Sequence, residues 1–122
     1  MKTPANLVSM ANAARYNEAN KATYRRCALY WLRLVAAKLA LPKGTYDIRF
    51  NPGGIACGGD ATLHHDSFYL TLNEMGGYFR RCKGRKDYTG ERNIWFNGYG
   101  ESLSNETLLL AISAQCLTPK PI

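Results

Sequence analysis

The chain has 122 residues, of which 46% are hydrophobic, enough for one domain with a buried core. Charged residues make up 20%, too few for a disordered protein, so we expect a single folded domain over residues 1–122. The net charge of +7 favours an anionic partner: nucleic acid, an acidic protein surface or an anionic membrane. No apolar segment reaches the roughly 20 residues of a membrane-spanning helix, so we expect no membrane span.

Two helices are predicted at the start of the chain. Thr3 followed by Pro4 is typical of a helix start and predicts a short helix from about Pro4 to Arg15. A longer helix is predicted from about Glu18 to Leu41, where Pro42 stops it. The expected apolar face of the longer helix consists of Cys27, Tyr30, Trp31, Leu34, Val35 and Leu41.

Three arginines lie on the longer predicted helix. Arg26 and Arg33 are seven residues apart and share a face, whereas Arg25 is displaced by about 100 degrees. They form either a solvated stripe opposite the core or a stripe that contacts phosphate groups.

From Thr45 onward the pattern has a period of two residues, which is typical of strands. Tyr46, Ile48 and Phe50 alternate with polar residues and predict a half-buried strand. Turn signals bracket a short segment at residues 55–57, and residues 62–65 then lead into the apolar residues of 68–72. With residues 78–82 and 92–96 as a final hairpin, the pattern predicts an antiparallel meander of about four strands.

The last predicted element is a helix that runs from the N-cap Ser104 to about Leu117. Its apolar face contains Leu108, Leu109, Ile112 and Cys116. Helices at both ends of the chain therefore pack on one side of a central antiparallel sheet, and the predicted fold class is α+β.

Residues 78–99 read YFRRCKGRKDYTGERNIWFNGY and mix cations with aromatic rings. Cations attract phosphate and exposed rings stack on unpaired bases, so this mixture suits contact with nucleic acid. The alternative is a solvated hairpin tip. We expect either Trp95 or Phe96 to face the core and Tyr88 to be exposed. The candidate binding residues are Arg80, Arg81, Lys83, Arg85, Lys86, Tyr88 and Arg92, with Arg25, Arg26 and Arg33 as an extension.

Other residues that could carry chemistry are weakly patterned. The glycines of residues 53–59 match neither a P-loop nor a dinucleotide-binding loop, and paired turns or a bulge are expected there. Cys57 could act as a nucleophile with His64, or bind a metal with His64 or His65, but adjacent histidines in a strand point to opposite faces. The simpler interpretation of His64 and His65 is a polar turn or edge strand. We expect no enzyme activity, no cofactor and no metal.

The four cysteines, at intervals of 30, 25 and 34 residues, form no CxxC pair. The first residues, MKTPANLVSM, lack the apolar stretch of a signal peptide. We therefore expect a cytoplasmic protein with free thiols, and a disulfide framework is the alternative.

Two segments, SFYLTLNEMGGYF at 67–79 and WFNGYGESLSNETLLLAISAQCL at 95–117, resemble the ArdB/KlcA antirestriction family. They share with it two aromatic strands around an Asn/Gly turn, then an Asn-Gly loop and an acid-plus-Ser start to an apolar helix. The chain departs from the family at Thr107, Leu108 and Leu109, at the extra residues Glu74 and Met75, and in its positive charge. The resemblance implies a small plasmid- or phage-borne protein that blunts type I restriction, with no established catalytic residues.

The leading hypothesis is a non-enzymatic counter-defence protein of a mobile genetic element, of the antirestriction or anti-CRISPR type. Such a protein would bind and occlude a restriction enzyme, a CRISPR effector or the associated nucleic acid through its basic surface. The alternatives are a basic nucleic-acid-binding module without a counter-defence role, and a small cysteine- or metal-dependent enzyme around Cys57 and His64.

Overall fold

The computed structural model describes residues 1–82, 93–96 and 104–117. The helices are α1 (Pro4–Ala13), α2 (Glu18–Lys38) and α3 (Asn105–Ile112), and α3 continues into a π-helical turn at Ser113–Leu117. Between α2 and α3 lie the strands β1 (Tyr46–Asn51), β2 (Asp60–His65), β3 (Phe68–Asn73), β4 (Gly76–Arg81) and β5 (Asn93–Phe96).

The strands form one antiparallel sheet in the order β1-β2-β3-β4-β5, so neighbours in the chain are neighbours in the sheet. This arrangement confirms the α+β class and the predicted meander. The described sheet has five strands because Asp66 and Ser67 bend the chain between β2 and β3, which the sequence pattern had joined. Residues 55 and 56 form a turn, in the stretch where paired turns or a bulge were expected.

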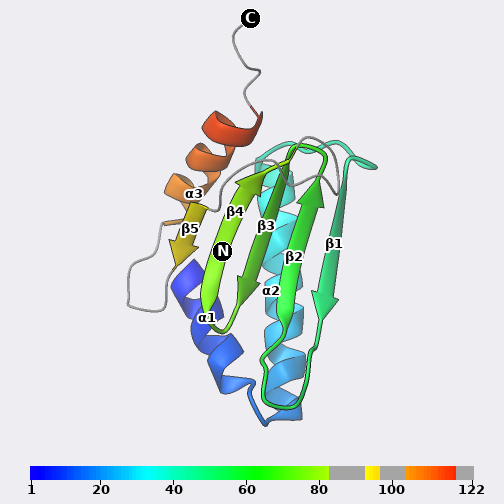
Figure 1. Cartoon of the computed structure of the whole chain (residues 1–122), viewed down its shortest axis with the longest axis vertical. Coiled ribbons are helices and arrows are strands. Elements are labelled where there is room, and N and C mark those ends of the chain that lie inside the picture. Colours follow the sequence, from blue (N-terminus) through cyan, green and yellow to red (C-terminus); the bar gives the residue numbers. More distant parts are fainter. Residues whose placement is uncertain (83–92, 97–103, 118–122) are drawn as a thin grey trace, which may run out of the picture.

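The helices and the sheet form two layers, with α2 behind the sheet in Figure 1. Alternate residues of the strands point toward the helices, and Leu63, Leu70 and Phe79 are fully buried there. Side chains of all three helices join them in one core. The opposite face of the sheet carries polar and aromatic side chains, including His64, Tyr69, Tyr78 and Arg80, whose positions pair across the strands.

The predicted helix starts are confirmed by hydrogen bonds. Thr3 Oγ1 accepts from the Asn6 N–H over 3.2 Å, and Ser104 Oγ accepts from the Thr107 N–H over 3.1 Å. Each bond satisfies an amide that the first helical turn leaves without a partner, which fixes where the helix begins.

Helix α2 ends at Lys38, before the predicted end at Leu41. Ala40 adopts a left-handed conformation with a φ of 55°, and the Leu41 N–H donates to the Ala36 carbonyl over 3.0 Å. These are the features of a Schellman motif, with alanine at the position that usually holds glycine. The backbone therefore stops the helix before Pro42 does.

The predicted apolar face of α2 is partly wrong. The buried side chains are those of Lys21, Tyr24, Ala28, Trp31, Leu32, Val35 and Ala36. Tyr30, predicted on the buried face, is 59% exposed. Ala28 and Ala36 are among the buried residues, and Tyr30 lies on the opposite side of the helix from Ala28.

Among the helices that the structure describes, none has both the length and the hydropathy that crossing a bilayer would need.

Candidate functional site

The three arginines of α2 line one groove on the side of the helix that borders β1. The groove has a volume of about 300 Å³, and its lining residues are Ala22, Arg25, Arg26, Leu29 and Arg33. The arginine side chains are exposed, and the helical rise places the first and last of them about 12 Å apart along the axis. The structure thus brings together the three α2 residues that the sequence analysis proposed as an extension.

Packing against β1 fixes the position of Arg25. Its guanidinium carbon lies 5.8 Å from the centre of the Phe50 ring, a cation–π distance. Phe50 in turn meets the buried Tyr24 ring edge-to-face, with 5.8 Å between the ring centres. The core therefore supports the aromatic ring on which Arg25 rests, and the planar cation is held at the rim of the groove.

The described ion pairs lie away from the three arginines of the groove. Among the described residues, ion pairs join Arg15 to Glu74 at 3.7 Å and Arg49 to Asp47 at 3.6 Å. Neither involves an arginine of the groove. Three positive charges along one side of a helix repel one another, and an anion placed among them would relieve that repulsion.

Arg80 and Arg81 lie in β4, so they are part of the sheet rather than of a loop. Because successive strand residues face opposite sides, Arg80 points to the face away from the helices and Arg81 to the helical face. Both are half-buried. Three strand spacings, about 14 Å, separate β4 from β1 beside the α2 groove, so the two arginines of β4 do not extend that groove.

The other predicted members of the basic segment, Lys83, Arg85, Lys86, Tyr88 and Arg92, lie outside the described residues. Trp95 and Phe96 lie in β5, and their division between core and surface stays a prediction.

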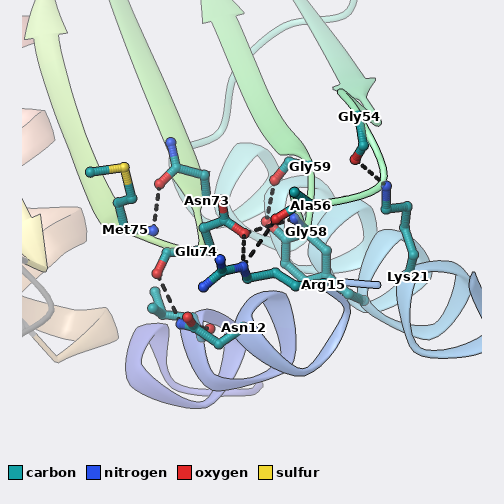
Figure 2. Close-up of polar contacts among 12 residues, drawn as sticks. Asn12, Arg15, Lys21, Gly54, Ala56, Gly58, Gly59, Asn73, Glu74 and Met75 are labelled. Carbon is teal, nitrogen blue, oxygen red and sulfur yellow. Dashed lines mark hydrogen bonds and ion pairs between the residues drawn. The ribbon is translucent and has the colours of Figure 1, made fainter. Parts of the chain in front are cut away.

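The glycine-rich loop of residues 52–59 is fastened to the rest of the fold by polar contacts (Figure 2). The Gly58 N–H donates to Oε2 of Glu74 over 2.8 Å, and Nε of Arg15 donates to the Ala56 carbonyl over 3.0 Å. Asn12 Nδ2 donates to the Glu74 carbonyl over 2.9 Å and ties the β3–β4 turn to α1. A backbone amide of the loop therefore binds an anion, but this anion is a carboxylate of the same chain.

Lys21 is a buried cation that the sequence analysis missed. Its side chain is 9% exposed, and Nζ donates to the Pro52 and Gly54 carbonyls, both over 3.1 Å. Figure 2 shows its side chain reaching from α2 to the loop. Lys21 lies three residues before Tyr24 and seven before Ala28, and this spacing could have revealed a lysine on the buried face.

Cys57 and His64 do not form a catalytic pair. Cys57 lies in the loop before β2, and His64 lies four residues beyond the first residue of β2, about 13 Å along the strand. The His64 ring packs edge-to-face on Tyr69, with 4.4 Å between the ring centres. In the described part of the chain, no group of three His, Cys, Asp or Glu side chains could hold a metal ion.

The four cysteines are free thiols, and their environments differ. Cys57 is exposed, whereas Cys116 is buried in the π-helical turn after α3. Burial raises the pKa of the Cys116 thiol from its ordinary 9.0 to about 11, although Arg81 acts in the opposite direction. Burial also raises the pKa of the Tyr24 hydroxyl, and the charges of Asp60 and Glu74 add to that increase.

We expect stability to fall as the pH rises from about 9 toward 11. In this range the unfolded chain loses the Cys116 proton while the folded chain keeps it, so the unfolded state binds fewer protons. Urea titrations at about pH 8 and pH 10 measure the change. Cys116→Ala should make the dependence shallower, and the raised pKa of the Tyr24 hydroxyl accounts for the part that is left. If the free energy of unfolding changed equally with pH in wild type and in Cys116→Ala, the assignment of this dependence to Cys116 would be wrong.

In comparisons with family models, curated proteins and solved structures, none matches this chain. The resemblance of residues 67–79 and 95–117 to the ArdB/KlcA family stays a prediction.

Proposed function

We propose that the chain is a non-enzymatic binding protein of a phage or plasmid that occludes a host DNA-defence complex through its basic surface. The observation that carries the proposal is the α2 groove, where Arg25, Arg26 and Arg33 are exposed and have no acidic partner among the described residues. Phosphate groups of nucleic acid are the anions that such a surface attracts most strongly.

Occlusion requires a docking surface and no catalytic group. The exposed side of α2 can cover a phosphate backbone. Alternatively, it can occupy the groove of a defence protein that normally holds DNA or guide RNA. The inhibitor would then act on a restriction enzyme or a CRISPR effector by excluding the nucleic acid that the complex needs. The packing of α2 on the core supports this role, because it places the three cations along one side of the helix, with Arg25 held over Phe50.

The binding surface is tested by removing three charges from the groove. The variant with Arg25, Arg26 and Arg33 changed to Gln should bind duplex or single-stranded nucleic acid at least about tenfold more weakly than wild type. Fluorescence anisotropy at several salt concentrations measures the affinity, and the salt dependence should become shallower. A matched control changes Lys2, Lys38 and Lys43 to Gln, which removes the same charge from exposed residues outside the groove.

The biological role is tested in cells. Wild-type protein should protect an incoming plasmid from a type I restriction system or a CRISPR effector, and the groove variant should not. Binding to nucleic acid without any protection would support the alternative of a plain nucleic-acid-binding module. If the control variant lost affinity to the same extent, the net charge of the protein, and not the groove, would determine the affinity for nucleic acid.

A further inference from the structure

A second hollow continues the groove toward the start of α2. It has a volume of about 370 Å³ and is lined by Glu18, Lys21, Ala22, Arg25, Phe50 and Pro52. It shares Ala22 and Arg25 with the groove, so the two adjoin at these residues. Its volume lies at the lower end of the range for small-molecule pockets, which is enough for one ring system.

The chemistry of the hollow differs from that of the groove. The groove offers three cations, whereas the hollow combines the Phe50 ring, the Arg25 guanidinium over it and the carboxylate of Glu18. Aromatic rings and guanidinium planes are the surfaces on which unpaired bases stack. A carboxylate accepts hydrogen bonds from the amino groups at base edges. The hollow therefore suits a base, and the groove suits the phosphates beside it.

We propose that the hollow binds one unpaired base of a single-stranded nucleic acid whose backbone lies along the α2 groove. This inference rests on the proposed function and names the form of nucleic acid that the surface selects. A base within a duplex is stacked on both faces and paired along one edge, so it cannot enter the hollow while the helix stays intact. Stacking in the hollow therefore favours the single strand, whereas the groove alone would attract either form.

Affinity for matched oligonucleotides tests the inference. A labelled single-stranded oligonucleotide should bind about tenfold more tightly than the duplex of the same sequence at the same salt concentration. A strand with 2-aminopurine as the reporter base should lose fluorescence when that base stacks in the hollow. Equal affinity for the two forms would overturn the inference and leave the proposed function standing. Absence of binding to either form would contradict nucleic-acid binding by the groove itself.

A charge-conserving substitution separates stacking from attraction. Arg25→Lys keeps the positive charge but removes the planar guanidinium, so affinity for the single strand should fall about fivefold more than affinity for the duplex does. Arg33→Lys, in the groove and outside the hollow, is the matched control and should change both affinities alike. If Arg25→Lys weakens both forms equally, the hollow does not hold a base. Because both side chains are exposed, neither substitution disturbs the core.

Discussion

Replacing Gly58 with alanine should lower the free energy of unfolding by about 3 kcal/mol, an effect of overpacking. A Cβ atom at this position would lie 2.2 Å from the Ala11 carbonyl oxygen and 2.9 Å from its carbon. Both are backbone atoms of α1, so the clash cannot be relieved by turning a side chain. The loop would have to move away from α1, which would also strain the bond from the Gly58 N–H to Glu74.

Gly54→Ala is the matched control in the same loop. A Cβ at Gly54 meets no atom within 4 Å, so its stability should stay within about 0.5 kcal/mol of wild type. Urea unfolding followed by circular dichroism measures both variants. Similar losses in the two would show that the loop does not pack on α1 as described.

Replacing Lys21 with methionine should lower the free energy of unfolding by about 2 kcal/mol. Methionine keeps the apolar stem in place but cannot donate to the Pro52 and Gly54 carbonyls, which Nζ reaches over 3.1 Å. Hydrogen bonds from a charged donor are stronger than neutral ones, and two are lost together. The start of the glycine-rich loop would then be held less firmly to α2.

Lys38→Met provides the control, since Lys38 is exposed at the end of the same helix. It removes the same charge and should change stability by less than about 0.5 kcal/mol. If Lys21→Met is as stable as wild type, water replaces the ammonium at the two carbonyls, and the contact does not hold the loop.

The sequence predicts the elements whose signals are local. Thr3 and Ser104 mark helix starts because a cap bonds to an amide only three residues away. The alternation in Tyr46, Ile48 and Phe50 predicts β1 because it is set by the strand's own geometry. These signals were enough to predict the α+β class and the order of the elements.

The orientation of α2 could not be predicted in the same way. Its apolar residues cover more than one side of the helix, and the face that is buried depends on how α1, β1 and β2 pack against it. Tyr30 was therefore placed on the wrong side. Lys21 was overlooked because its carbonyl partners lie more than thirty residues away in the chain.

The candidate site was predictable in part. The spacing of Arg26 and Arg33 indicated a common face, and the structure places both in one groove. The position of Arg25 in this groove depends on its contact with Phe50, which belongs to β1. Sequence proximity grouped Arg80 with Arg81, but the alternation of β4 sends them to opposite faces of the sheet.

The order of the strands has a consequence for how the chain folds. β1, β2, β3 and β4 each pair with the next strand along the chain, so hairpins form by closing short loops, with little loss of chain entropy. Topologies rich in such local pairings fold quickly. During synthesis, α1 and α2 leave the ribosome before the strands on which they pack. The apolar face of α2 therefore stays uncovered until β1 and β2 have been synthesised. During this interval the exposed apolar surface makes the nascent chain prone to aggregation.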